Sequence, residues 1–348
     1  MNSLALLSAL VWATFIAFLV VLFMPERSEE ERSRIRMVGL AGAGFSFFVA
    51  TVFVLLGQVA LAEGGGLTAA NEENHRWLGS FAFISNYHLT ADGLTLPLLV
   101  LSTIVFGCVM FHSWRVRENV RLYIAMLLLL ETATNGVLCS ADLMLFVLFW
   151  GLQVAPLYIL IRVFGGPHRL RAANRYLGFA LVSLALLMAA VLLVIVKAGG
   201  NSSDISTDFQ QLLGPVETAG FWLSFTAFAV AMGVFPAHHW MVDAHGEASA
   251  GVAAVAASLL LMLGAFGLMR NTLPLFPVAA HHFSLALAGL AVVGAIWGSV
   301  IALRQDDLRR TETWRRCHSC CWASPPRTLS RSRVRCFSWW RVGCRRRC

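Results

Sequence analysis

The chain has 348 residues, of which 58% are hydrophobic and only 13% charged, and its mean hydropathy is +0.70. A soluble domain carries about twice that share of charged residues, so the composition excludes an ordinary soluble enzyme or binding domain. The sequence predicts an integral membrane protein.

Nine apolar runs are long enough to cross a bilayer, whose hydrocarbon core takes about 20 helical residues. They cover residues 4–23, 38–61, 94–111, 122–138, 143–161, 176–196, 221–237, 252–269 and 283–303. A spanning backbone must satisfy its own hydrogen bonds, and the sequence lacks the alternation of barrel strands. We therefore expect an all-α polytopic bundle of about nine spans. The first run lacks the positive charge and cleavage site of a signal peptide and is interpreted as a span.

Basic residues gather in alternate loops between these runs. One set of loops holds Arg27, Arg32, Arg34, Arg36, Arg115, Arg117, Arg121, Arg162, Arg169, Arg171, Arg175, Arg304, Arg309 and Arg310, and the other holds only Arg76, Lys197 and Arg270. Because basic loops stay in the cytoplasm, this asymmetry predicts an N-terminus outside the cytoplasm.

Residues 311–348 differ sharply from the rest of the chain. They hold ten arginines, one glutamate and six of the eight cysteines, and so carry the whole positive surplus behind the pI of 9.4. One hypothesis is a zinc site, but the spacing of its candidate ligands matches no ordinary knuckle; they are Cys317, His318, Cys320, Cys321 and Cys336. A second is a basic tail that binds anionic lipid or RNA. The third hypothesis, which we expect to hold, is that the chain is translated out of frame after about Arg310. When plausible codons are assigned from Ser319 onward and read two bases later, they encode an apolar segment.

Ionisable residues inside spans are costly unless they are paired or hydrated. Glu131 lies in the middle of the fourth run, and we expect its carboxyl to be protonated or to face a hydrated cavity. Asp142 precedes the fifth run, where an N-cap is the simpler interpretation.

The stretch VFPAHHWMVDAHGEASAG, from Val234, places polar residues between two apolar runs. Pro236 predicts a break in the seventh helix, because proline lacks an N–H and clashes with the preceding turn. Interrupted backbone at membrane depth must be buried in protein or line water. His238, His239 and His245 could carry protons there, together with Asp243 and Glu247. The alternative is an interfacial loop that only anchors the helix end.

Several motifs in chain order carry a family resemblance. They are DGLTLPLLVL from Asp92, ADLMLFVLFWGLQVAPLYILIRVF from Ala141, FPAHHWMVDAHGEASAG from Phe235, GAFGLMRNTLPLFP from Gly264 and ALRQDDLRR from Ala302. Together they resemble the proton-translocating membrane subunits of respiratory complex I, chain M of NADH:quinone oxidoreductase in particular, which are related to the Mrp-type cation/proton antiporters. The resemblance implies inverted helical repeats with a broken helix near Pro236.

The resemblance also implies a domain organisation and a set of partners. Residues 1–91 would form N-terminal spans and an external loop, 92–310 an incomplete antiporter-like domain, and 311–348 the out-of-frame tail. This chain would hold no catalytic centre, metal or cofactor, and NADH, FMN, iron–sulfur clusters and quinone would bind partner subunits. Its surroundings would be other membrane subunits and the lipid bilayer, without nucleic acid, in the inner membrane of a bacterial-type cell.

Three charges that the family uses for proton transfer are missing. Gly151 stands where the family carries a glutamate, and Ala231 and Met262 stand where it carries two lysines. None of these side chains titrates, so a proton route would need substitutes. The candidates are Glu131, His238, His239, Asp243, His245, Glu247 and Arg175, the last replacing another basic residue. The alternatives are a structural spacer subunit, or a component of a related antiporter or uptake system.

Overall fold

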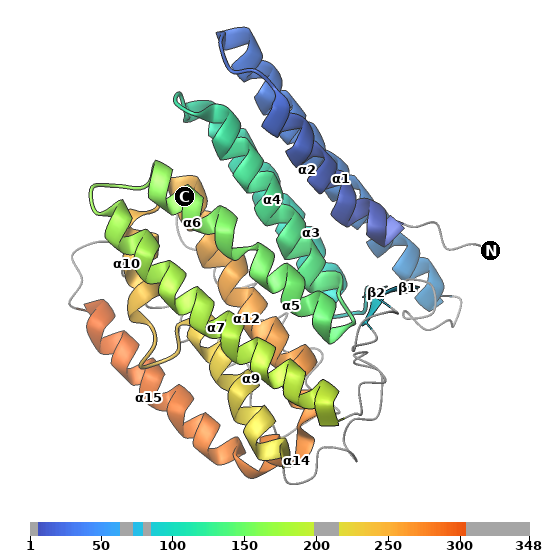
Figure 1. Ribbon diagram of the computed structural model, residues 1–348, viewed down its shortest axis with the longest axis vertical. Helices are drawn as coiled ribbons and strands as arrows, with labels where there is room; N and C mark the ends of the chain where they lie inside the picture. The colour runs from blue at the N-terminus through green and yellow to red at the C-terminus, as the bar shows by residue number, and fades with distance from the viewer. Residues whose placement is uncertain (1–5, 63–71, 79–84, 198–215, 304–348) are drawn as a thin grey trace.

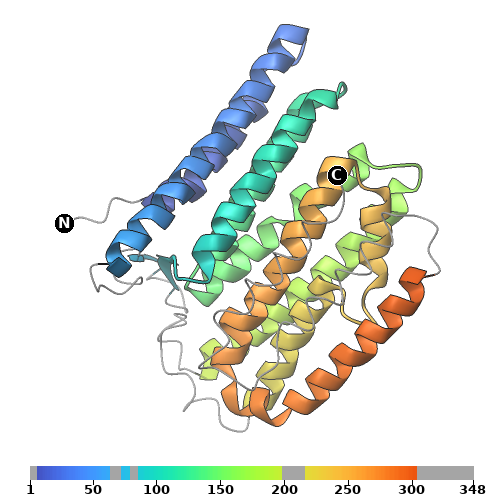
Figure 2. The same ribbon diagram turned by 180° about the vertical axis from the view of Figure 1, so that it is seen from behind.

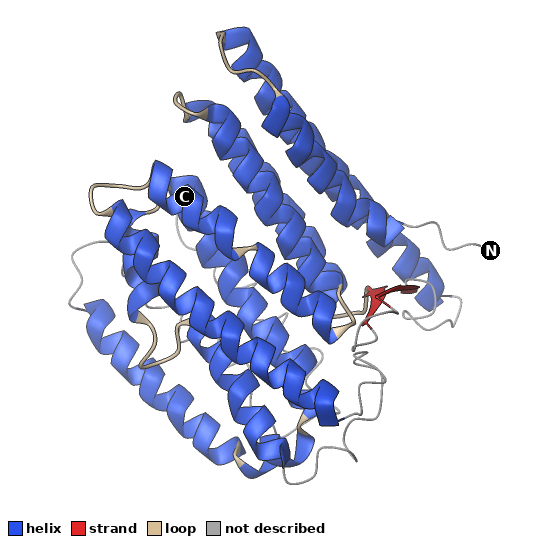
Figure 3. Ribbon diagram, in the orientation of Figure 1, coloured by secondary structure: helices blue, strands red, loops and turns tan. Residues whose placement is uncertain are grey.

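The computed structural model describes residues 6–62, 72–78, 85–197 and 216–303, which form a bundle of helices with one small hairpin (Figure 3). The N-terminal half contains α1 Leu6–Phe23, α2 Glu29–Ala62, β1 Glu72–Leu78, β2 Ser85–Thr90, α3 Thr95–His112, η1 Ser113–Arg115, α4 Val120–Cys139, α5 Leu143–Leu152 and α6 Val154–Phe164. The remainder contains α7 Arg169–Lys197, α9 Glu217–Met232, α10 His239–Glu247, α11 Ala250–Val255, η3 Ala256–Leu260, α12 Leu261–Gly267, η4 Leu268–Thr272, α13 Leu273–Leu275, α14 Pro277–His282 and α15 Ser284–Leu303.

The helical membrane fold is confirmed. Within the described ranges, seven segments are long and apolar enough to cross a bilayer: α1, α2 as far as Leu55, α3 with η1, α4, α5 with α6, α7, and Ala250–Leu275. The other two predicted runs form α9, which has 16 residues, and α15, whose apolar stretch Ser284–Trp297 is shorter than a span. The count of nine spans therefore stays a prediction, as do the proposed domain boundaries. The tail at 311–348 lies outside the described residues.

Helix α4 is the centre of the N-terminal half. Together with α3 it lies between the α1–α2 pair and the remaining helices in both views (Figures 1 and 2), and 17 of its 20 residues are buried. Helix α1 instead exposes Ile16 (58%) and Phe23 (82%). In a soluble protein such apolar exposure would promote aggregation, whereas here these side chains face the space that lipid fills.

The hairpin β1–β2 covers one end of the bundle, within a segment for which the sequence predicted only an external loop. Its Glu73 side chain accepts a hydrogen bond from the Leu7 N–H (2.9 Å) at the start of α1. Asp142 caps α5 as expected, accepting from the N–H groups of Met144 (2.8 Å) and Leu145 (3.1 Å). Asp142 also accepts from the Asn86 N–H of β2 (3.1 Å), so its carboxylate ties the hairpin to the bundle.

Arg270 joins the hairpin to three helices at the same end. Its guanidinium donates to the hydroxyls of Thr90 and Thr95, both at 2.6 Å, and to the Leu138 carbonyl at 3.1 Å. Asp92 lies 3.9 Å from it. Burial by itself would raise the pKa of the Asp92 carboxyl, but Arg270 and hydrogen bonds from Thr95 and Leu94 outweigh burial and lower that pKa.

We expect Asp92→Asn to remove an acid-dependent part of the stability. A carboxyl with a lowered folded-state pKa stabilises the fold above its unfolded pKa of about 3.9, and this contribution disappears as the pH falls through the folded value. Thermal unfolding of the detergent-solubilised protein should show a lower midpoint for the variant at neutral pH. The difference from wild type should shrink at pH about 3. A difference that does not change with pH would contradict this role of Asp92.

Candidate functional site

The chain is not helical between α9 and α10. Helix α9 ends at Met232, Gly233 adopts the left-handed conformation (φ 66°), and α10 begins at His239. Pro236 lies inside this turn. Helix α9 therefore ends about one helical turn before Pro236, the residue at which the sequence predicted the break. The break is made at Gly233 because only glycine takes this conformation without a Cβ penalty.

The backbone groups freed at the end of α9 find partners in the protein. The Gly233 N–H donates to the Val230 carbonyl (3.1 Å), and the Val234 N–H donates to Ala229 (2.9 Å). The buried Trp240 indole N–H also donates to Val230 (2.9 Å). Trp240 therefore closes the turn from inside the bundle, a role that the sequence did not predict.

The three histidines near this turn differ in exposure. His238 and His245 are buried, while His239 is exposed, and the rings of His238 and His239 lie 4.2 Å apart between centroids. The His238 ring also stacks on Phe235 at 5.8 Å. The pair therefore reaches from the protein interior to the surface of the turn.

Asp243 and Glu247 lie on α10 and contact different elements. Asp243 forms an ion pair with Arg175 of α7. The fold thus brings together two of the residues that were predicted for the site. The Glu247 carboxylate accepts a hydrogen bond from the His168 N–H (2.9 Å). The backbone carbonyl of Glu247 accepts another from the Gly166 N–H (2.7 Å). A Cβ at Gly166 would lie 2.7 Å from Glu247 Oε2, so a side chain at this position would require the carboxylate to shift.

We expect Glu247→Gln to keep the fold and Glu247→Ala to loosen the α6–α7 loop. Glutamine retains an oxygen that can accept the His168 N–H, whereas alanine leaves that exposed donor to water; the net contribution of one such hydrogen bond is about 0.5–1.5 kcal/mol. Limited proteolysis near His168 should then accelerate only in Glu247→Ala. Equal cleavage of both variants would mean that the charge of Glu247, rather than its oxygen, holds the loop.

Glu131 is fully buried in the middle of α4, away from Asp243 and Glu247 of α10. It accepts a hydrogen bond from the Ser46 hydroxyl of α2, while its Oε2 atom has no hydrogen-bond partner among the described residues. The described contacts do not join Glu131 to Asp243, Glu247 or Arg175. The predicted site therefore divides into two separate groups.

A line of polar groups leads from Glu131 toward the hairpin end of the bundle. Glu131, Asn135 and Leu138 are spaced i, i+4 and i+7, on one face of α4. Asn135 Oδ1 accepts from the Ser102 hydroxyl of α3 (3.1 Å), and the Leu138 carbonyl accepts from Arg270, which faces Asp92. We call Glu131, Asn135, Ser102, Arg270 and Asp92 the α4 polar line. From Glu131 to Leu138, α4 rises about 10 Å along this line.

Sequence reasoning did not single out Asn135. It is fully buried, and its Nδ2 atom has no partner in the described part of the chain, like Glu131 Oε2. The sequence does carry a signal for Asn135, because this amide lies one helical turn after Glu131 within the same apolar run. Two unsatisfied buried polar atoms on one helix face suit bridging by internal water.

The positions of the missing family charges are neutral in this fold. A cavity of about 30 Å³ lies between α5, α6, α7, α9, α10 and η3. It is lined by Trp150, Gln153, Val154, Tyr176, Phe179, Ala180, Ser183, Val230, Ala231, Trp240 and Leu260. Gln153 is buried, and its Oε1 atom has no partner within the described ranges. Gly151 faces Leu184, and Met262 packs with apolar side chains.

These features define a class: a multi-pass helical membrane protein with an interrupted helix and a buried carboxylate. Residues 140–311 match the family model described as NADH:quinone oxidoreductase/Mrp antiporter, TM. This part of the chain therefore belongs to the family of antiporter-like membrane subunits.

Its relatives place the similarity more closely. NAD(P)H-quinone oxidoreductase chain 4 2 of Thermosynechococcus vestitus is 32% identical over 301 residues, which are 85% of this chain and 55% of the relative. NAD(P)H-quinone oxidoreductase chain 4 3 of Picosynechococcus is 36% identical over 244 residues, covering 68% and 43%. The chain thus spans about half the length of the curated relatives that it matches.

Solved structures share the fold. A chain of respiratory complex I from Thermus thermophilus with bound NADH superposes with a TM-score of 0.79 at 22% identity, covering 91% of this chain and 63% of that one. A chain of the archaeal membrane-bound sulfane sulfur reductase gives 0.77 at 15% identity, covering 92% and 64%. The helical membrane-subunit fold predicted from the family resemblance is therefore confirmed, while the inverted repeats and the broken helix near Pro236 stay predictions.

Proposed function

We propose that the chain works as a membrane-arm subunit of an NADH:quinone oxidoreductase-like complex and carries protons through the α4 polar line. The observation that carries this proposal is Glu131, a fully buried carboxylate whose Oε2 atom has no partner among the described residues. A carboxyl at that depth is stable only in its protonated form or beside water, and either condition makes it a candidate to take up and release a proton. Redox groups would lie on partner subunits, and NADH, FMN, iron–sulfur clusters and quinone would bind there.

The polar line supports release of protons at the hairpin end. Asp92 is partly exposed, with 37% of its side chain accessible, and it opens the line to solvent beside Arg270. On the other side of Glu131, the same face of α4 continues with buried apolar residues such as Leu127 and Ile124. Protons would therefore leave Glu131 toward the Asp92 end, and a conformational change would be needed to load Glu131 from the opposite end.

We further infer the orientation and the membrane. The loops between α1 and α2, between α3 and α4, and between α6 and α7 lie at one end of the bundle, opposite the hairpin (Figure 1). Most of the arginines of the described ranges lie in these loops or in the adjoining turns of the helices, which supports a cytoplasmic position for that end and an N-terminus outside. The inner membrane of a bacterial-type cell is the compartment in which a quinone-linked complex would use such a subunit.

A spacer subunit is the second candidate, and the cavity at Ala231 favours it. In place of a titratable pair, the chain lines this cavity with an amide, hydroxyls and apolar groups. A subunit with no proton route of its own could still connect neighbouring subunits.

The two candidates differ in proton yield. Membrane vesicles with and without the chain should be compared for NADH-dependent pH-gradient formation at equal electron flux. The proposal predicts fewer protons per electron when the chain is absent from an otherwise assembled complex. An unchanged ratio would support the spacer, and failure of a tagged full-length chain to copurify with quinone reductase activity would exclude both candidates.

A further inference from the structure

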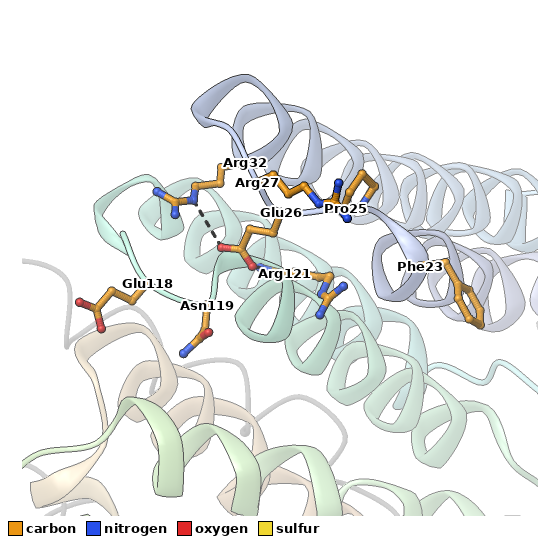
Figure 4. Close-up of a pocket in the computed structure, with 8 residues that line it drawn as sticks. All are labelled: Phe23, Pro25, Glu26, Arg27, Arg32, Glu118, Asn119 and Arg121. Carbon is orange, nitrogen blue, oxygen red and sulfur yellow. Dashed lines mark hydrogen bonds and ion pairs between the residues drawn. The ribbon is translucent and has the colours of Figure 1, made fainter.

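A pocket of about 720 Å³ opens where the α1–α2 loop meets the start of α4 (Figure 4). Its lining is mostly charged: Phe23, Pro25, Glu26, Arg27, Arg32, Glu118, Asn119 and Arg121. The pocket lies at the end of the bundle opposite the hairpin and is separate from both groups of the candidate site.

Two of its arginines are available to a ligand. Arg27 and Arg121 are exposed and form no ion pair with a described residue; Arg121 Nη1 donates only to the Met24 carbonyl at 3.3 Å. Glu26, in contrast, already has partners. Its carboxylate accepts from the N–H groups of Val120 (2.9 Å) and Arg121 (3.2 Å).

The pairing of Glu26 leaves a surplus of positive charge. Glu26 lies 3.5 Å from Arg32 Nε, and Arg32 Nη1 also lies 2.7 Å from Glu29 Oε1 outside the pocket. The pocket lining itself holds three arginines against two glutamates. The Glu118 side chain is drawn apart from Arg27 and Arg121 in Figure 4. The unmatched guanidinium groups therefore suit an anion, and arginine binds phosphate with particular geometric fit.

An apolar stripe on α1 leads directly to this pocket. Trp12 (41%), Ile16 (58%), Leu19 (37%) and Phe23 (82%) are exposed, and their spacing of four, three and four residues puts them on one helix face. From Trp12 to Phe23 the helix rises about 16 Å, close to half of the roughly 30 Å hydrocarbon core. The stripe thus matches the length of an acyl chain in one leaflet.

We propose that this pocket binds an anionic phospholipid, with its phosphate between Arg27 and Arg121 and an acyl chain along the α1 stripe. The charge of the two arginines selects the headgroup, and Phe23, which also lines the pocket, connects the headgroup site to the stripe. A soluble phosphate compound would use the arginines but gain nothing from the apolar side chains.

The test measures binding of fluorescent phosphatidylglycerol to the purified full-length chain in neutral detergent micelles. We expect Arg27→Gln with Arg121→Gln to weaken binding by about tenfold or more, because each basic residue near a membrane surface contributes about 1 kcal/mol. The matched control is Arg34→Gln with Arg117→Gln. It removes the same charge from exposed arginines at the same end but outside the pocket, and it should leave binding unchanged.

Competition identifies the ligand. Unlabelled phosphatidylglycerol should displace the probe, while phosphatidylcholine and glycerol phosphate at equal concentration should not. Equal loss of binding in the pocket and control variants would overturn the proposal, since the effect would then come from overall charge. Full displacement by glycerol phosphate or by phosphatidylcholine would overturn it as well, the first by removing the role of the stripe and the second by removing selection for the anion.

Discussion

Replacing Glu131 with glutamine is expected to lower proton flux through the chain by more than tenfold while leaving the fold intact. Glutamine keeps the size of the side chain and can still bond to the Ser46 hydroxyl, but it cannot release a proton. A positioned acid–base group typically contributes about 10²–10⁴-fold to a proton-transfer rate. The measurement is pH-dye fluorescence in proteoliposomes containing the full chain, driven by a potassium diffusion potential.

The matched control for Glu131 is Thr134→Val. Thr134 is also buried in α4, and among the described residues its hydroxyl bonds only to the Leu130 carbonyl of its own helix (2.8 Å). Flux through this variant should equal that of the wild type. If both variants lower the flux alike, the effect reflects packing of α4 rather than a titrating carboxyl.

Replacing Ala231 with lysine should destabilise the protein by about 3 kcal/mol more than replacing it with methionine. Both side chains overfill the cavity of about 30 Å³ at this position, and overpacking costs about 1–3 kcal/mol in each case. Only lysine adds a charge, and no carboxylate lines the cavity to pair with it. The difference between the two variants therefore isolates the cost of an unpaired buried charge.

Adding Gln153→Glu to Ala231→Lys should recover most of this loss. Both positions line the same cavity, so the new carboxylate and ammonium would lie within reach of each other and stabilise both charged forms. Thermal unfolding midpoints of the four proteins form a double-mutant cycle. Additive losses, with no coupling between the two substitutions, would show that the cavity does not bring these side chains together.

The apolar runs predicted the spanning helices well because hydrophobic length is a local property. The run at 122–138 became α4 Val120–Cys139, while the run at 176–196 became the longer α7, Arg169–Lys197, whose first turns are polar. The run at 143–161 is divided at Gln153 into α5 and α6, and apolar content alone carries no signal for that division.

The candidate site was harder to predict, because its partners are distant in the sequence. The sequence placed Glu131 in the middle of a span, where the structure buries it, but its hydrogen bond to Ser46 joins residues 85 positions apart. Glu247 was predicted as a proton carrier. In the structure its carboxylate accepts a hydrogen bond from the His168 backbone N–H, and its role in carrying protons stays a prediction. The helix break depends on the conformation of Gly233, which the sequence marks less clearly than the neighbouring Pro236.

The most direct measurement is the infrared difference spectrum of the carboxyl C=O band while the complex turns over with NADH. The proposed function predicts a band that changes during turnover, shifts on carboxyl ¹³C labelling and is absent from Glu131→Gln. The same spectrum in the wild type and in Glu131→Gln would contradict the claim that this buried carboxyl carries protons.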